Sequence, residues 1–475
     1  MPCPVPCPCT KTPSVLLVRP LCEGDEPEFA EPLGIERLAG YLQEHGVQDV
    51  YVCDRRLYVA ERRAHAALAD APSFYEELRA KYPSGFDPDV VGLSLMTASD
   101  VPDALRVMSR LGSWWPKARF VVGGVYVTHA AEEVARRFPR GTTLLRGEGE
   151  VALLDFVRGY AKADVRHACA PDEWARPYRR DLERYARLGC AVNMQTSRGC
   201  PGTCTFCATP QLPAGLRRWQ PRSLRLVADE IQFEASRLER AGLPPIFNFV
   251  DDDFGPLSRA EELADELGRR ELRVAFSLEM RMAALVREPS LARRLERLRD
   301  AGLTRVFVGV ESLDPTTLKR WHKSYDVHAL PQVVSAFASA GVCLQVGYIL
   351  WHKDQTPQGA QSEVEALWRL GIYTHQMALS RLIVFPGCAL ATQTSSRGFE
   401  SLAPDAEFFY RRFAERTDVL RVRWLRAALR EPHVAARAWL DGNTSERDAL
   451  RAELADVNRL SYEAYADLCA QARGT

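Results

Sequence analysis

The chain has 475 residues, of which 46% are hydrophobic and 26% charged, a composition ordinary for a globular protein of two or three domains. Its 62 basic and 62 acidic side chains cancel, which argues against the strongly basic surface of a nucleic-acid-binding protein. No apolar run approaches the roughly 18 residues that a membrane-spanning helix needs.

The N-terminal residues 1–12 alternate proline with Cys3, Cys7 and Cys9. Three cysteines raise the alternative of a metal site, but a proline-rich terminus is typical of a disordered tail, which we predict here. The prolines also exclude the helical apolar core of a signal peptide. Because thirteen cysteines without such a signal indicate a reducing compartment, the expected location is the cytoplasm.

Residues 13–160 alternate short apolar runs with amphipathic segments, the pattern of repeated β-α units. Such repeats predict an α/β fold with a parallel, doubly wound, Rossmann-like sheet. The expected strands are 14–19, 49–54, 90–97 and 120–125, with a closing segment at 142–150. Helices are expected at 32–45, at 101–111 and from the fourth strand to 137, with helix and loop over 57–88.

Ligands of doubly wound sheets bind at the carboxyl ends of the strands. In this domain those ends carry glycine and hydroxyl-bearing residues, and glycine there permits either a tight turn or the close approach of a ligand. The predicted ligand contacts are Thr97, Ser99, Gly123, Gly124, Gly147 and Gly149. His129, after the double-glycine strand, is interpreted as a loop-surface histidine. A charged segment, 161–189, is interpreted as the connection to the next domain.

A second β-α series fills residues 190–390. Its expected strands are 191–196, 246–254, 274–278, 305–312, 344–350 and 377–385. Its expected helices are 223–238, 258–269, 290–301, 327–340 and 359–370. Six such units predict a partial (β/α)6 barrel with its chemistry at the carboxyl ends of the strands. Residues 391–475 predict a small helical C-terminal domain, with helices near 405–430, 432–440 and 444–470.

The loop after the first strand of this barrel holds Cys200, Cys204 and Cys207 in a C-x3-C-x2-C spacing. A structural zinc site would need a fourth ligand, and no second Cys or His pair follows at a suitable spacing. Cysteines this close together are poorly placed to form a disulfide, and one would be left over. Three thiolates on a four-iron cluster leave one iron without a protein ligand, so the loop predicts a [4Fe–4S] cluster with an open position.

Polar residues follow the next strands of the predicted barrel. They are Asp251, Asp252 and Asp253 after the second strand, Glu279 and Arg281 after the third, and Glu311 and Ser312 after the fourth. A buried strand that ends in three carboxylates is costly unless the charges find donors or face a polar cavity. At least one of the three aspartates is expected to cap the following helix.

These motifs resemble the radical S-adenosylmethionine (SAM) superfamily over residues 190–390. The resemblance rests on the cysteine loop with Phe206 before its last cysteine, on Phe249-Val-Asp-Asp-Asp-Phe254, on Gly309-Val-Glu-Ser-Leu-Asp, on Val346-Gly-Tyr-Ile-Leu and on Phe385-Pro-Gly387. It implies that the three cysteines hold the cluster and that the open iron chelates SAM. Reductive cleavage of SAM then gives a 5′-deoxyadenosyl radical, which abstracts hydrogen from an unactivated carbon.

The same resemblance implies roles for the strand-end residues. Glu311 or Ser312 would contact the ribose of SAM, and Glu279, Arg281 or the aspartates would contact its methionyl end. One departure from the family follows Leu350, where Gly-x-Pro is usual and this chain has Trp351-His352. That pair would either line a modified substrate pocket or form an exposed loop variation.

The first domain resembles the cobalamin-binding domain of cobalamin-type radical SAM proteins. The motifs are Leu17-Val-Arg-Pro20, the helix that begins Pro32-Leu-Gly-Ile35, Val121-Val-Gly-Gly-Val-Tyr-Val-Thr128 and Arg146-Gly-Glu-Gly-Glu150. In that family the strand-end loops grip the corrin and its nucleotide tail. The chain has no Asp-x-His-x-x-Gly motif, so no histidine would replace the lower axial ligand. Cobalamin thus joins the cluster and SAM as an expected cofactor.

Two enzyme functions share the radical step. In the first, methylcobalamin delivers a methyl group to an unactivated carbon of a small specialised metabolite. In the second, no cobalamin is bound and the radical drives dehydration or deoxygenation of a diol, such as a sugar or aminoglycoside intermediate in antibiotic biosynthesis. A non-catalytic iron–sulfur protein is the alternative of another class, and an open cluster beside acidic strand ends disfavours it.

The family favours methylation. The expected partners are a small-molecule substrate and an external electron donor of the flavodoxin or ferredoxin type, with no nucleic acid and no membrane.

Overall fold

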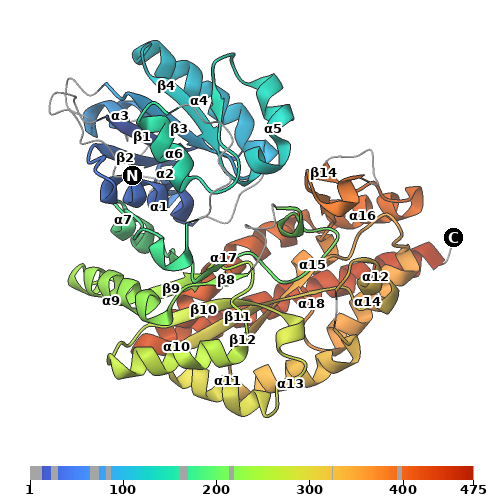
Figure 1. The fold of residues 1–475 in the computed structure, drawn as a ribbon. Coiled ribbons are helices and arrows are strands. Elements are labelled where there is room, and N and C mark those ends of the chain that lie inside the picture. Colours follow the sequence, from blue (N-terminus) through green and yellow to red (C-terminus); the bar gives the residue numbers. More distant parts are fainter. Residues whose placement is uncertain are drawn as a thin grey trace. The chain divides into compact units, whose positions relative to one another are not determined.

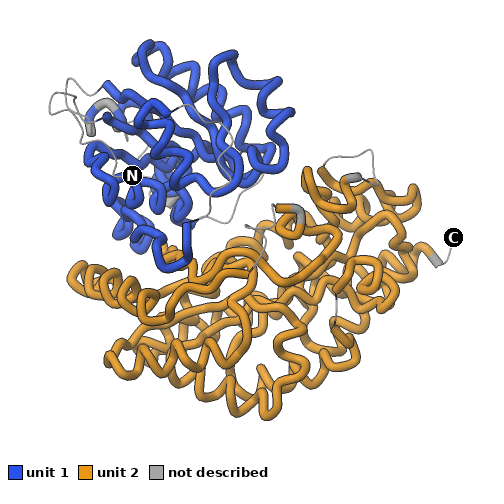
Figure 2. The backbone as a smooth tube through the Cα atoms, viewed as in Figure 1, with its two compact units in different colours: residues 1–188 blue, residues 189–475 orange. Residues whose placement is uncertain are grey.

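Two parallel β-sheets, each accompanied by helices, organise the chain (Figure 1). The structure is a computed structural model that describes residues 13–22, 30–64, 74–81, 87–160, 169–212, 219–323, 325–392 and 398–473. The chain divides into two compact units, unit 1 (residues 1–188) and unit 2 (residues 189–475), shown in Figure 2. The predicted tail with Cys3, Cys7 and Cys9 lies outside the described residues. Within the described ranges no helix is long and apolar enough to cross a membrane.

Unit 1 is a doubly wound sheet whose strands pair in parallel in the order β2-β1-β3-β4-β5. The strands are β1 (Val15–Arg19), β2 (Val50–Asp54), β3 (Val90–Ser94), β4 (Arg119–Gly123) and β5 (Thr143–Leu144). The helices are α1 (Leu33–Glu44), α2 (Arg55–Ala64), α3 (Phe74–Lys81), α4 (Val101–Trp114), α5 (Val125–Arg137), α6 (Glu150–Val157) and α7 (Leu182–Arg187). The predicted Rossmann-like class of this unit is confirmed.

Alternate residues of β1 enter two separate cores, one on each face of the sheet. Leu16 and Val18 pack in a core with residues of α4 and α5, whereas Val15 and Leu17 pack in a core with residues of α1 and α6. All four side chains are at most 2% exposed. A parallel strand buried on both faces reads as a continuous apolar run. That is why this segment could be predicted as a strand.

The charged segment after α6 packs on unit 1. Trp174 is buried in the same core as Val15. Arg179 forms an ion pair with Glu31, N to O 3.0 Å, and neither side chain is exposed. Burial of a pair like this one requires good geometry, so it fixes the path of the chain here. The predicted domain boundaries stay predictions: 1–12, 13–160, 161–189, 190–390 and 391–475.

Unit 2 contains the second parallel sheet, in the order β12-β11-β10-β9-β6. Its strands are β6 (Val192–Met194), β9 (Ile246–Phe249), β10 (Ala275–Arg281), β11 (Leu303–Glu311) and β12 (Cys343–Tyr348). The helices of this part are α9 (Leu224–Arg240), α10 (Leu257–Arg269), α11 (Leu291–Asp300), α12 (Pro315–Arg320), α13 (Leu330–Ala340) and α14 (Pro357–Arg369). Helices α10, α11 and α13 lie along one face of this sheet (Figure 1). The predicted α/β class, a parallel sheet with an added helical region, is confirmed.

The sixth predicted strand, 377–385, is wrong over its first residues. His375–Leu379 forms a short helix, α15, because the Thr374 hydroxyl accepts from the backbone N of Met377 and caps its start. At the sixth strand position the described residues contribute a single parallel bridge, Trp351 to Arg381. Beyond it, β13 (Ile383–Val384) pairs antiparallel with β14 (Gly398–Phe399).

The C-terminal region is helical, as predicted, but its breaks differ. The helices are α16 (Pro404–Arg416), α17 (Asp418–Asp441) and α18 (Ser445–Arg473). Pro432 does not end a helix, because α17 continues through it and buries Val434, Ala435 and Ala436. Proline removes one helical hydrogen bond, and packing of this face outweighs that loss.

Helix α17 covers the sheet face opposite to α10 and α11. Ile246 of β9 and Ala275 of β10 are register partners, and both pack against Ala436 of α17. The amino-terminal half of this sheet face is therefore closed by the chain itself, which leaves the carboxyl ends of the strands for chemistry.

Candidate functional site

The cysteine loop follows β6 and is framed by a small antiparallel pair, β7 (Ser197–Arg198) with β8 (Gln220–Pro221). Cys200, Cys204 and Cys207 are half-buried and reduced. Among the described residues no three or more His, Cys, Asp and Glu side chains surround one common metal position. Each thiolate of a cubane cluster binds a different iron, so these cysteines need not converge on a single ion.

Gly202 makes room beside two of the thiols. A Cβ at this position would lie 3.3 Å from the Sγ of Cys200 and 3.8 Å from that of Cys204. The backbone N of Gly202 also donates to the Sγ of Cys200, at 3.3 Å. Donors of this kind are typical around cluster sulfurs. Glycine at this position therefore leaves the two thiols uncrowded, and its N–H is a donor of the kind that suits a cluster sulfur.

Burial raises the pKa of the Cys200 thiol to about 11, and burial likewise raises the pKa of Cys204 above its ordinary value. A buried thiolate needs a nearby positive charge. Lys323 and Arg281 lie near enough to favour the thiolates, and a bound cluster would supply further positive charge. The donor set thus matches the cofactor that the spacing predicts.

The second half of the loop is held by segments far away in the chain. The backbone N of Thr205 donates to the carbonyl of Trp321 at 3.1 Å, and Leu390 N donates to the carbonyl of Thr205 at 3.1 Å. Phe206, predicted as a cofactor contact, packs edge-to-face on Trp321 with ring centroids 5.4 Å apart. Cys388, fully buried, lies close to Cys207.

The aspartates that follow β9 fasten the first half of the loop. The carboxylate of Asp251 accepts from the backbone N of Thr196 at 2.7 Å, from its hydroxyl at 2.9 Å and from the backbone N of Ser197. Asp252 accepts from the backbone N of Gly199 at 3.1 Å. These bonds link β9 to the residues directly before Cys200, so the acidic run positions the cysteines.

Asp253 completes the set by pairing with Arg281 of β10, Nε to Oδ2 2.7 Å. The Arg281 side chain reaches the cysteine loop, since its Cδ would be 3.8 Å from a Cβ at Gly202. Glu279, half-buried on the same strand, accepts from the backbone N of Phe254 through its carbonyl at 2.9 Å. The expected helix cap is wrong, because α10 begins after Pro256 without a side-chain cap.

Glu311 and Ser312 take different positions at the end of β11. Glu311 has a positive φ of 71°, and its carboxylate pairs with the Nζ of Lys323 at 3.1 Å. Burial lowers the pKa of Lys323, but Glu311 and Cys204 outweigh this effect, so its pKa lies above the ordinary value. Ser312 is buried and donates to Glu363 at 3.0 Å. Of the two predicted ribose contacts, Glu311 is the one beside the cysteines.

Trp351 and His352 are both buried, so they neither line an open pocket nor form an exposed loop. Trp351 is fully buried, donates to the carbonyl of Ala378 at 2.8 Å and packs on Phe409 of α16. His352 is buried edge-to-face against Trp321, and burial together with Arg320 lowers its pKa to about 4. Both interpretations made for this pair are wrong, because α16 covers Trp351 and the Trp321 ring covers His352.

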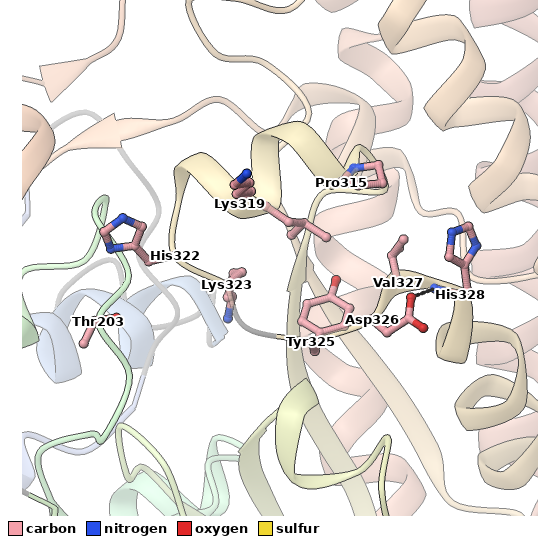
Figure 3. A pocket seen from close by; sticks show the side chains of 10 residues that line it. Thr203, Pro315, Lys319, His322, Lys323, Tyr325, Asp326, Val327 and His328 are labelled. Atoms are coloured by element: carbon pink, nitrogen blue, oxygen red, sulfur yellow. Dashed lines mark hydrogen bonds between the residues drawn. The ribbon is translucent and has the colours of Figure 1, made fainter.

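An open pocket of about 450 Å³ adjoins the cysteine loop (Figure 3). Thr203, between two of the cluster cysteines in sequence, and His322 lie on one side of it, and Asp326 and His328 lie on the other. Lys323 also lines it. The sequence reasoning missed this pocket and the role of Lys323, because a lysine in a loop after α12 carries no signal of its own.

In unit 1 the predicted contacts gather at one edge of the sheet. Gly123 ends β4, Gly124 caps the start of α5, and Thr97 follows β3. Gly147 follows β5 and donates through its backbone N to the Thr128 hydroxyl at 3.0 Å. Ser99 lies in the short 3₁₀ turn that starts at Ala98, and Gly149 packs under Leu38. At the same strand ends Met96 is 47% exposed and Val125 50% exposed.

The end of β1 differs, because an ion pair occupies it. Arg19 pairs with Asp100, N to O 2.9 Å, and Asp100 also accepts from the backbone N of Met96 and of Thr97. The open part of this edge, by which we mean the carboxyl ends of the strands, therefore runs from β3 to β5. Its surface consists of small and apolar residues. His129 lies on α5 and is half-buried, so its interpretation as a loop-surface histidine is wrong. Burial, with Arg146, lowers its pKa.

Gly124→Ala is expected to destabilise the protein by about 3 kcal/mol or more. Gly124 has φ 104° and ψ 178°, a region open essentially to glycine alone. A Cβ would also lie 2.4 Å from the carbonyl O of Leu95. Gly141→Ala is the matched control, because Gly141 has φ 92° but open space around it, so about 1 kcal/mol is expected. Denaturant unfolding measures both variants. If both lost the same free energy of unfolding, the close contact between Gly124 and Leu95 would be contradicted.

A protein-family model matches part of each unit. The model of the radical SAM superfamily matches residues 194–354, and the model of the B12 binding domain matches residues 27–157. The first range contains the cysteine loop and the strand ends of unit 2, and the second contains the strand-end residues of unit 1.

Two curated relatives with named activities share low sequence identity with this chain. Anaerobic magnesium-protoporphyrin IX monomethyl ester cyclase of Rubrivivax gelatinosus is 24% identical over 381 residues, which cover 72% of this chain and 63% of the cyclase. Hopanoid C-2 methylase of Rhodopseudomonas palustris is 32% identical over 168 residues, which cover 35% of this chain and 31% of the methylase. The alignments thus span less than two thirds of the length of either relative.

Among solved structures, the cobalamin-dependent SAM radical enzyme OxsB with aqua-cobalamin and SAM bound has a TM-score of 0.71 at 16% identity, over 95% of this chain and 72% of that chain. At this identity the likeness shows a shared fold. A radical SAM domain implies a [4Fe–4S] cluster and SAM, and the B12 binding domain supports cobalamin as the third expected cofactor. The chain therefore carries a radical SAM domain, matched over residues 194–354, and ahead of it a B12 binding domain, matched over residues 27–157.

Proposed function

We propose that this chain is a cobalamin-dependent radical SAM methyltransferase that methylates an unactivated carbon of a small-molecule substrate. The observation that carries the proposal is the open edge from β3 to β5 in unit 1, where Met96 and Val125 stand exposed. A corrin presents a broad, mainly apolar face, and a surface of small and apolar residues suits it. The methylase relative supports the same direction.

When bound, the cluster and SAM supply a 5′-deoxyadenosyl radical, and cobalamin supplies a transferable methyl group. Cys200, Cys204 and Cys207 hold the cluster in the space beside Gly202. Lys323 and Arg281 offset the negative charge of the thiolates. Their own partners, Glu311 and Asp253, keep both cations in place.

The remaining residues orient the cofactors. Asp251 and Asp252 fix the start of the loop, Glu311 offers a carboxylate to SAM hydroxyl groups, and Glu279 offers one to its methionyl end. In unit 1 the hydroxyls of Thr97 and Ser99 and the backbone of Gly123, Gly124, Gly147 and Gly149 serve the cobalamin. Reduction of a bound cluster would need an external electron donor.

The rival enzyme function is dehydration without cobalamin. Neither of the two curated relatives, the cyclase and the methylase, is named as a dehydratase. The cyclase relative shows that proteins similar to this chain have more than one named reaction. Product analysis must therefore accompany any cofactor measurement.

Anaerobic reconstitution is expected to give a protein with one corrin per chain beside its cluster. Val125→Glu places a charge on the proposed corrin surface and is expected to remove most of the cobalt while cluster iron stays unchanged. Val419→Glu is the matched control, since Val419 on α17 is 75% exposed. Cobalt content, iron content and the visible spectrum are the measurements. A chain that methylates its substrate while free of cobalt, or that binds none, would sink the proposal.

A further inference from the structure

The pocket beside the cysteine loop has a small apolar floor and a polar, exposed rim. Pro315, Leu318, Tyr325 and Val327 line it together with charged and hydroxyl groups. Leu318 is buried, and the Tyr325 hydroxyl donates to the carbonyl of Val310 at 2.7 Å, so its ring faces the pocket as an apolar surface. An apolar centre inside a polar rim is the anatomy of a protein interface.

The rim carries more N–H donors than carboxylates. Lys319, His322 and His328 are exposed around it, against a single exposed carboxylate, Asp326. Asp326 accepts from the backbone N of His328 at 3.0 Å, which uses part of its acceptor capacity. The other lysine of the wall, Lys323, is neutralised by Glu311.

His322 occupies a backbone position that usually belongs to glycine. Its φ is 54°, and the backbone N of Lys323 donates to the carbonyl of Leu318 at 2.9 Å, which closes α12 in a Schellman motif. A non-glycine residue held in this conformation costs free energy. An exposed histidine here is thus retained at a cost, on the rim of the pocket.

The pocket adjoins the cluster loop. Thr203 contributes to its wall and is exposed, and Lys323 extends from the same wall into the surroundings of Cys204 and Cys200. A small-molecule site encloses most of its ligand, whereas the charged groups of this rim lie open to solvent. A macromolecule that must come near the cluster without entering the site fits this position.

We propose that this pocket is the docking surface for the electron donor, and that the donor is an acidic carrier protein of the flavodoxin type. Carboxylates of the carrier would meet Lys319, His322 and His328, and an apolar side chain would fill the floor. One electron would pass from the reduced flavin to the cluster, with no atom transferred. The docking surface relies on the proposed function only for the presence of a reducible cluster, and not for methyl transfer.

The test measures cluster reduction in the loaded chain by stopped-flow absorbance, with flavodoxin hydroquinone or with dithionite. Lys319→Glu is expected to slow reduction by flavodoxin about tenfold at low ionic strength. Reduction by dithionite is expected to stay unchanged, because a small reductant needs no docking. Titration calorimetry with oxidised flavodoxin is expected to show about a tenfold weaker affinity.

Two further variants make the result decisive. His322→Gly relieves the left-handed backbone, so the chain stays at least as stable, yet flavodoxin-driven reduction is expected to slow severalfold. Lys117→Glu makes the same charge change at an exposed lysine of unit 1 and is expected to have no effect. Flavodoxin that does not bind the unaltered chain, or equal rates for all variants, would overturn the docking surface. An equal loss with dithionite would also overturn it, since Lys319 would then act on the cluster itself.

Discussion

Cys204→Ala is expected to abolish the cluster and, with it, the production of 5′-deoxyadenosine from SAM. Two thiolates are too few to hold a four-iron cluster that already lacks a fourth protein ligand. The other charges of the site would then face an empty position, because Lys323 lies against Cys204 and Glu311. Iron content, the visible absorbance of the reconstituted protein and the 5′-deoxyadenosine yield are the measurements.

Cys190→Ala is the matched control, since Cys190 is also half-buried but lies outside the loop. It is expected to keep full iron content and full SAM cleavage. Cys388 lies near Cys207 and could replace a lost cluster ligand. Adding Cys388→Ala to Cys204→Ala removes this alternative. Continued 5′-deoxyadenosine production in the Cys204→Ala, Cys388→Ala double variant would contradict both the cluster assignment and the proposed function.

The regular elements could be predicted because their residues repeat with a period. Strand β1 and helix α1 lie within a residue or two of the predicted ranges, since both are specified by local apolar patterns. Strand β9 is shorter than predicted and ends at Phe249. Asp251 leaves the strand direction to bind the cysteine loop, and a contact across the chain has no local period.

The C-terminal part shows the same limit. Met377–Leu379 belongs to a run predicted as a strand but is helical, because Met, Ala and Leu favour helix and Thr374 caps its start. Pro432 is a local helix breaker, but the packing of α17 on the sheet outweighs it. Trp351 was a candidate for a substrate pocket only because it follows a predicted strand. The helices that bury it belong to the C-terminal region, in which no sequence motif was found.

For the site, the identity of the cluster cysteines follows from their spacing, whereas what holds them does not. Asp251 lies 55 residues from Thr196, and Trp321 lies still further from Thr205. The acidic run was predicted to contact SAM or cap a helix. Its hydrogen bonds show a positioning role for Asp251, and no sequence rule separates these uses of a carboxylate.

Asp251 therefore offers a test of loop positioning that differs from the test of cluster ligation. The side chain is 1% exposed and accepts from two backbone N–H groups and one hydroxyl. Asp251→Ala leaves these donors buried without an acceptor and is expected to cost on the order of 4 kcal/mol. The loop would also lose its anchor, so cluster retention is expected to fall although all three cysteines remain.

Asp251→Asn keeps an oxygen for the backbone donors, so it is expected to retain the cluster, and it removes the titrating group. Burial raises the pKa of Asp251 to about 6 in the folded chain, above the ordinary aspartate value of 3.8. Between these values the folded state holds a proton that the unfolded state has released, so Asp251 adds stability as the pH falls through this window and loses it as the pH rises. The free energy of unfolding of Asp251→Asn relative to the unaltered chain is therefore expected to be higher at pH 7 than at pH 4, by on the order of 3 kcal/mol. Denaturant unfolding at both pH values measures this difference, and a difference of the opposite sign would show that the hydrogen bonds of Thr196 and Ser197 stabilise the carboxylate more than burial disfavours it.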